Sequence, residues 1–251
     1  MPEWVQAGMW GLLSGGALVV GAAVAWLVRV PPRVIAGVMA FGAGVLISAL
    51  AFDLMAEAAD VGGLGPTALG FVAGAVVYTV ANVALARRGA RHRKRSGDEQ
   101  PSEDEHSGSG TALALGALLD GVPESVVLGV SLLGGGGVSV TVVAAVFISN
   151  VPEGLSSAAG MRSAGRSARY VFGLWSAIAV ASGVAALVGN LALGGVSPAV
   201  IATITAVAAG AVLAMLTDTM IPEAVERAGL ATGLLTVLGF LTAFSIERLG
   251  E

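Results

Sequence analysis

Two short motifs combine oxygen-bearing side chains with a proline. They read Asp120-Gly-Val-Pro-Glu124-Ser and Ser149-Asn150-Val-Pro-Glu153-Gly, so Val-Pro-Glu recurs after 29 residues. In a helix, positions i and i+4 lie on one face, which pairs Asp120 with Glu124 and Ser149 with Glu153. Each proline removes a backbone N–H and frees a carbonyl nearby. Three carboxylates, a hydroxyl and an amide predict a cation site of hard oxygen ligands.

The elements that carry these motifs are predicted to span a membrane. A membrane helix needs about 20 apolar residues, and long stretches of the sequence, such as 4–28, 61–86 and 170–217, contain no charged residue. Breaks are predicted at Gly134–Gly137 and at 193–198. We therefore expect an all-α polytopic membrane protein whose eight spans are about 8–28, 34–57, 66–86, 111–133, 138–161, 170–192, 198–221 and 229–246.

Composition supports this class and excludes others. Of the 251 residues, 55% are hydrophobic and only 12% are charged, about half the charge of an ordinary soluble domain. The absence of cysteine excludes a disulfide framework and a thiolate metal site. The net charge of −4 argues against a nucleic-acid partner. We expect no enzyme and no cofactor, since no histidine lies in a span to serve a protease centre and no phosphate-binding Gly-rich motif is present.

The basic residues predict the orientation. Twelve of the thirteen fall on one side of an eight-span topology, and only Arg248 falls on the other. The positive-inside rule makes that side cytoplasmic, with both termini outside a cell (inner) membrane. One integral membrane domain is expected: spans 1–3 in 1–86, a flexible cytoplasmic loop in 87–110, spans 4 and 5 in 111–161, and spans 6–8 in 162–251. The two histidines, His92 and His106, are interpreted as solvated loop residues.

Buried carboxylates are the informative charges, because no Lys, Arg or His lies within a predicted span. Glu124 and Glu153 fall near mid-membrane, where a carboxylate is costly and is functional by default. We expect them to be protonated, hydrated or neutralised by a bound cation. The alternative is a pair of kinked helices whose protonated glutamates donate hydrogen bonds. Four more carboxylates, near span ends, are candidate steps of an ion pathway or water-solvated interfacial groups: Asp53, Glu57, Asp218 and Glu223.

The joint pattern resembles the ZIP (Zrt/Irt-like protein) family of divalent metal transporters. The resemblance covers the eight spans, the long loop after span 3, the paired Pro-Glu motifs, and segments 46–58 and 209–224. It implies a 3+2+3 arrangement, an inverted repeat of spans 1–3 and 6–8, a homodimer, and spans 1, 4, 5 and 6 moving against the others. Asp120 stands where the family usually has His, and Ser149 stands where it usually has His or Gln. Ala186 replaces a family glutamate.

The expected function is transport of a divalent cation toward the cytoplasm, with the ion as substrate. Its predicted ligands are Asp120, Glu124, Ser149, Asn150 and Glu153. An all-oxygen site suits manganese or ferrous iron as well as zinc. Two alternatives stay open: a proton-linked carrier of a non-metal solute, and a metal-binding membrane sensor that has lost transport.

Overall fold

The fold is a bundle of eight long apolar helices, and no strand occurs in the part of the chain that the structure describes. The structure is a computed structural model that describes residues 1–102, 104–105, 107–133 and 140–250. All eight helices are long and apolar enough to cross a membrane: Glu3–Leu27, Pro32–Gly62, Leu64–Ala90, Ser109–Val130, Val142–Ser163, Ala168–Leu193, Pro198–Ala228 and Ala231–Leu249. The prediction of eight helices long and apolar enough to span a membrane is confirmed, with ends up to seven residues from those expected. The predicted break at Gly134–Gly137 lies outside the described residues.

Within these spans the helices are bounded as follows. The first half contains α1 (Glu3–Leu27), α2 (Pro32–Ala49), η1 (Leu50–Met55), α3 (Ala56–Gly62), α4 (Leu64–Leu85), η2 (Ala86–Ala90) and α5 (Ser109–Val130). The second half contains α6 (Val140–Ser163), α7 (Ala168–Leu193), α8 (Pro198–Met215), η3 (Leu216–Met220), α9 (Ile221–Ala228) and α10 (Ala231–Gly250). The three η elements are π-helical turns, which occur frequently at functional sites.

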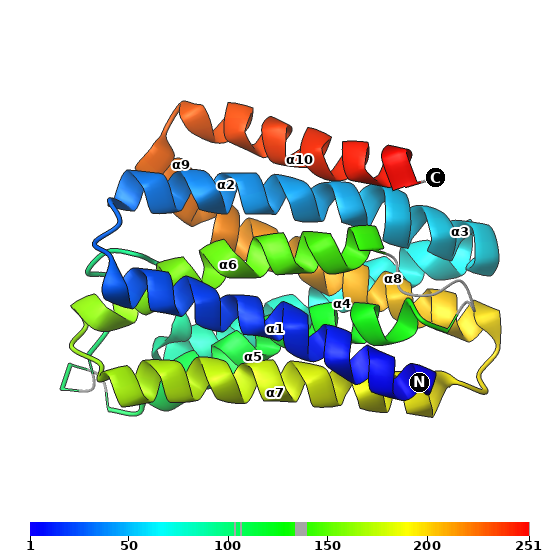
Figure 1. Ribbon diagram of the computed structural model, residues 1–251, viewed down its shortest axis with the longest axis horizontal. Helices are drawn as coiled ribbons and strands as arrows, with labels where there is room; N and C mark the ends of the chain where they lie inside the picture. The colour runs from blue at the N-terminus through cyan, green and yellow to red at the C-terminus, as the bar shows by residue number, and fades with distance from the viewer. Residues whose placement is uncertain (103, 106, 134–139, 251) are drawn as a thin grey trace.

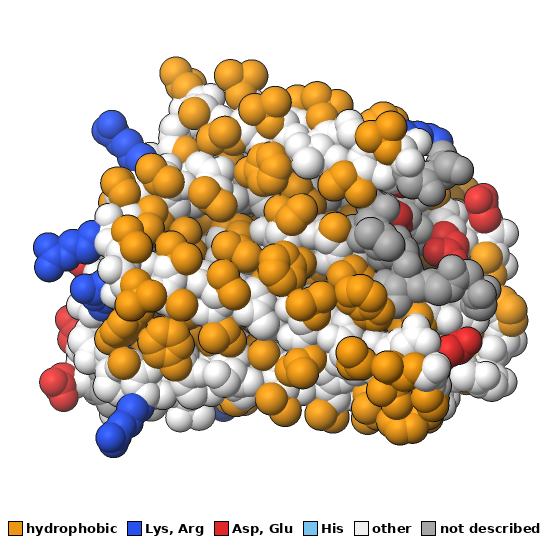
Figure 2. Space-filling model, in the orientation of Figure 1, with side chains coloured by type: hydrophobic (Ala, Val, Ile, Leu, Met, Phe, Trp, Pro, Cys, Tyr) orange, Lys and Arg blue, Asp and Glu red, His pale blue; other side chains and the backbone are white. Residues whose placement is uncertain are grey.

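The arrangement fits a multi-pass membrane protein. Both chain ends lie at one end of the bundle, and the α1–α2 and α6–α7 connections lie at the other (Figure 1). Apolar side chains cover the middle of the visible face, while charged side chains gather at its two ends (Figure 2). An apolar belt with charged ends is what a bilayer requires of a protein surface.

Glycines allow the helices to cross closely. A Cβ at Gly11 or Gly15 of α1 would lie 2.7 Å from the backbone of α7, and a Cβ at Gly74 of α4 would collide with the carbonyl oxygen of Val207 in α8. Small residues let helix backbones approach where lipid supplies no hydrophobic force between them. Gly11, Gly15 and Gly74 therefore serve the packing of α1 on α7 and of α4 on α8.

The helix with the second motif occupies the interior. In Figure 1, α6 lies between α1 and α2, and both pack along it. Direct packing between α5 and α6 is sparse in the described chain. The space between the two motifs is therefore open to side chains from elsewhere.

Candidate functional site

Both Pro-Glu motifs place their carboxylates inside the bundle. Pro123 lies within α5 and Pro152 within α6, and both helices continue through the proline. Asp120, Glu124 and Glu153 are only 1%, 4% and 3% exposed. Burial at this depth requires a carboxylate to be neutralised or paired.

A basic partner is present, contrary to the sequence-based expectation. Lys94, from the segment that follows η2, is 3% exposed. Its Nζ lies 2.8 Å from Glu153 Oε2 and 3.3 Å from Asp120 Oδ2. The expectation that these carboxylates lack a protein cation is wrong because the loop after span 3 folds back between the helices. One ammonium thereby links the two motifs.

Arg93 holds Asp120 from a second direction. Its Nε donates to Asp120 Oδ2 and its Nη2 to Oδ1, each at 2.8 Å. Tyr78 of α4 donates its hydroxyl hydrogen to Asp120 Oδ1 at 2.6 Å, and Asn82 Oδ1 accepts from Arg93 Nη1 at 2.8 Å. Burial lowers the pKa of the Arg93 guanidinium, but Asp120, Tyr78 and Glu153 together raise it by more, so the Arg93 pKa lies above its ordinary value. Arg93 is therefore a permanent cation here.

Glu124 differs from its two neighbours. Its Oε1 is buried and has no hydrogen-bond partner among the described residues. Glu124 interacts electrostatically with Glu153, Lys94 and Asp120. It also borders a cavity of about 20 Å³, enough for about one water-sized particle. The other lining residues are apolar: Leu46, Ala49, Leu50, Leu54, Val127, Val142, Val146 and Val212.

The two remaining predicted ligands are turned to other partners. The Ser149 hydroxyl donates to the Val146 carbonyl at 2.9 Å, and Asn150 Nδ2 donates to the Ser14 carbonyl of α1 at 2.9 Å. Both side chains are buried. The structure therefore brings Asp120 and Glu153 together around Lys94 and does not point Ser149 or the Asn150 amide nitrogen at that ammonium.

The four pathway candidates have unlike surroundings. Asp53 is half-buried in η1, and Glu57 is exposed in α3. Asp218 is exposed in η3 and accepts from Asn82 Nδ2 at 3.1 Å. Glu223 of α9 is fully buried, so its interpretation as a water-solvated carboxylate is wrong.

Glu223 instead anchors the segment that carries Lys94. It accepts hydrogen bonds from the backbone nitrogen of Ser96 at 3.0 Å and from the Ser96 hydroxyl, and it pairs with Arg95 at 3.3 Å. His92 Nδ1 lies 2.8 Å from the Glu99 carbonyl, and His106 lies outside the described residues. A loop interpreted from composition as flexible therefore has a docked first half.

Sequence reasoning missed Arg93 and Lys94 as site residues. Their position directly after a span was interpreted only as a topology signal. The available clue was the excess of interior carboxylates over interior cations, which a basic segment next to a span end could balance.

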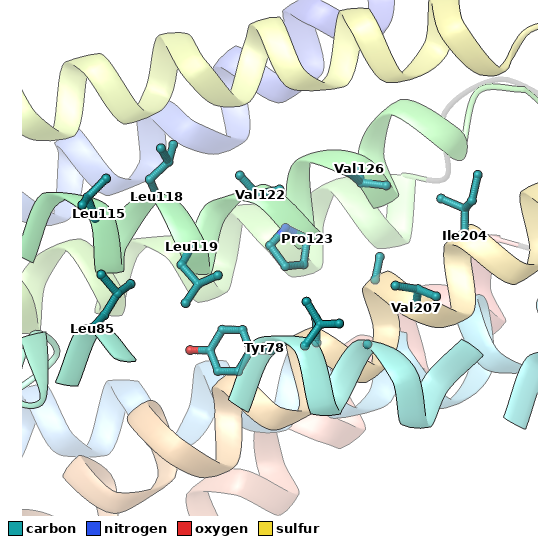
Figure 3. Close-up of a pocket in the computed structure, with 14 residues that line it drawn as sticks. Tyr78, Leu85, Leu115, Leu118, Leu119, Val122, Pro123, Val126, Ile204 and Val207 are labelled. Atoms are coloured by element: carbon teal, nitrogen blue, oxygen red, sulfur yellow. The ribbon is translucent and has the colours of Figure 1, made fainter. Parts of the chain in front are cut away.

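An apolar pocket lies behind the site. It has a volume of about 560 Å³ and is bordered by α4, α5 and α8, with Tyr78 and Pro123 in its lining. Figure 3 shows Tyr78, Leu119 and Pro123 among the side chains that line this pocket. Tyr78 therefore connects an apolar surface to the charged interior.

The described residues contain no group of three or more His, Cys, Asp and Glu side chains arranged to hold a metal. The arrangement can hold one cation between two helices, and here that cation is an ammonium. A scan of protein-family models and a search of curated proteins find no match to this chain.

Proposed function

We propose that this chain carries a divalent metal ion across the cell (inner) membrane toward the cytoplasm. Asp120, Glu124 and Glu153 would bind the ion, and Ser149 and Asn150 would complete the cage when their side chains turn inward. Zinc, manganese and ferrous iron are the candidate ions, and hard oxygen ligands favour the last two. The proposal includes membership of the ZIP family.

One observation carries the proposal: a cation already lies between carboxylates of two different spans. Lys94 Nζ is within ion-pair distance of both Asp120 and Glu153. Carboxylate oxygens that accept an ammonium also accept a metal ion, at the shorter distances of about 2.0–2.6 Å. The sparse packing between α5 and α6 leaves these groups free of intervening helix backbone.

Recurrence along the chain supports the transporter architecture. Segments 32–62 and 198–228 match at a constant spacing, as in Pro32 and Pro198, Gly44 and Gly210, and Glu57 and Glu223. Each segment forms a helix, a π-helical turn and a second helix. Their close crossings also correspond: Gly44 meets Thr236 of α10, and Gly210 meets Phe71 of α4. These matches favour the inverted repeat and the 3+2+3 arrangement, a common transporter plan.

The rest of the proposal follows from the resemblance and the basic residues. Spans 1, 4, 5 and 6 would move against the others in a homodimer, with both termini outside. Asp53 and Glu57 would serve the outer mouth and Asp218 the inner one. Glu223 would act at the inner mouth only after its contacts with Ser96 and Arg95 open.

A second function, a proton-linked carrier of a non-metal solute, is favoured by the charge balance. Arg93 and Lys94 pair with Asp120 and Glu153, which leaves Glu124 as the carboxylate without such a partner among the described residues. Arg93 and Lys94 also place positive charge in the interior, which an anionic solute would need. The sensor alternative is consistent with the absence of a three-ligand cluster in the described chain.

The test is ion flux into proteoliposomes. The purified full chain is compared with Glu124→Ala/Glu153→Ala and with Glu3→Ala/Asp98→Ala, which removes two exposed carboxylates. Flux of Zn²⁺, Mn²⁺, Fe²⁺, Co²⁺ and Cd²⁺ is measured. Flux that disappears only in the first variant supports the proposal. A folded chain that moves none of these ions contradicts it, and a proton flux driven by an added solute would then favour the second function.

A further inference from the structure

We propose that Lys94 is a tethered competitor of the transported ion: its ammonium and a divalent metal bind the same oxygens of Asp120 and Glu153, so metal binds where it displaces Lys94. This inference rests on the proposed function and deepens it. It makes Lys94 a residue that sets the affinity and the charge selectivity of the site.

The Lys94 backbone is fixed, and its side chain is directed into the site. The Ser156 hydroxyl of α6 donates to the Lys94 carbonyl at 2.6 Å. Gln100 Nε2 lies within hydrogen-bond distance of the carbonyls of Arg93, Arg95 and Ser157, at 3.0–3.1 Å. These contacts hold the segment against α6 on both sides of Lys94. The ammonium is thereby kept close to the carboxylates even when it is displaced from them.

The helices provide room for this segment. A Cβ at Gly160 of α6 would collide with the Arg95 carbonyl and with the Gln100 side chain. A Cβ at Gly116 of α5 would lie 2.6 Å from Arg93 Cδ. The two motif-bearing helices are therefore both shaped for the docked segment, and Glu223 holds it from a third, α9.

The distances at the site show that the Lys94 ammonium and a metal ion cannot bind there together. Lys94 Nζ lies 2.8 Å from Glu153 Oε2 and 3.3 Å from Asp120 Oδ2. A metal shared by those oxygens would lie about 2.0–2.6 Å from each, inside the volume that the ammonium fills. Both cannot occupy the position together.

Lys94 is the cation that yields, and Arg93 is the one that stays. Arg93 makes a two-pronged contact with Asp120 and is bonded to Tyr78 and Asn82 as well. Lys94 is a point charge on a flexible stem, and its Nζ has no hydrogen-bond partner in the described chain beyond its two ion-pair contacts. A divalent ion that takes the position of the ammonium brings one more positive charge to that position. Glu124 interacts electrostatically with a charge there. A monovalent ion adds none, so the exchange selects for divalent cations.

The experiment measures Mn²⁺ binding to the purified full chain in detergent, by the loss of the free-ion electron paramagnetic resonance signal. Lys94→Met is compared with Arg91→Met, which removes the same charge from an exposed side chain of the same segment. If the docked state dominates, Lys94→Met lowers the dissociation constant for Mn²⁺ about tenfold or more, because the competing state is removed. Arg91→Met leaves it within about twofold.

A second variant identifies the oxygens and guards against misfolding. Adding Glu153→Gln to Lys94→Met should cancel the gain in affinity, and the thermal unfolding of every variant is recorded. Unchanged or weaker Mn²⁺ binding in folded Lys94→Met, with a wild-type protein that does bind Mn²⁺, overturns this inference and leaves the proposed function standing. If no folded variant binds or transports Mn²⁺, Zn²⁺ or Fe²⁺, both fall.

Discussion

The two Pro-Glu motifs share the sequence Val-Pro-Glu but have different electrostatic surroundings. Glu153 in α6 pairs with an ammonium, whereas Glu124 in α5 faces a small apolar cavity and its Oε1 has no hydrogen-bond partner among the described residues. The difference comes from the segment after span 3, which enters between the helices and reaches one glutamate. A repeated motif therefore supplies equivalent positions, and a third element decides how each is used.

Removing Asp120 should have the largest effect on stability. Asp120→Asn leaves Arg93 buried without its carboxylate, and breaking a buried pair in this way costs about 3–5 kcal/mol. We expect a marked fall in the thermal unfolding temperature in detergent, whereas Asp98→Asn, on an exposed residue, should leave it unchanged. Equal unfolding temperatures for the two variants would show that the Arg93–Asp120 pair does not hold the loop in place.

Displacing the whole segment should leave Glu153 without its ammonium partner, as Glu124 already is. Gly160→Ala puts a methyl group against the Arg95 carbonyl and Gln100, and overpacking of this kind costs about 1–3 kcal/mol. Mn²⁺ binding should tighten, as in Lys94→Met, because the ammonium leaves with its backbone. Gly173→Ala in α7, where an added Cβ meets no atom within 4 Å, is the matched control. The same binding constant in both alanine variants would contradict the docking argument.

Single glutamine substitutions separate the two glutamates directly. Glu153→Gln weakens the contact to Lys94 and should cost about 1–2 kcal/mol, since Asp120 still pairs with that ammonium. Glu124→Gln removes no hydrogen bond of Oε1 found among the described residues, so its unfolding temperature should stay near that of wild type. Both should lose metal flux under the proposed function. A larger loss of stability in Glu124→Gln than in Glu153→Gln would show that Glu124, rather than Glu153, makes the stabilising contact.

The spans and the buried carboxylates could be predicted because both depend on local sequence. An apolar stretch of sufficient length, or a charge within one, is visible without a partner. The docking of Arg93 and Lys94 could not be predicted from the sequence, because it depends on a gap between α5 and α6 and on room at Gly116 and Gly160. Glu223 shows the same limit: its sequence position near a span end left open whether it was solvated, and only the folded loop explains its burial.

A smaller effect than that of Glu153→Gln is expected at Tyr78, which contacts the site from the side of the apolar pocket. Tyr78→Phe removes a hydroxyl that donates to Asp120 and accepts from Arg93 Nη2 at 2.7 Å. The direct Arg93–Asp120 contacts remain, so the cost should be about 1 kcal/mol.

Tyr170→Phe is the control, because its hydroxyl donates to the Gly110 backbone carbonyl rather than to a carboxylate. Thermal unfolding of both variants is compared in wild-type and Asp120→Asn backgrounds. If Tyr78 acts through Asp120, its effect should shrink when Asp120 is replaced, while the effect of Tyr170→Phe should not change. Equal effects of Tyr78→Phe in the two backgrounds would separate Tyr78 from the charged site and assign it to the packing of the apolar pocket alone.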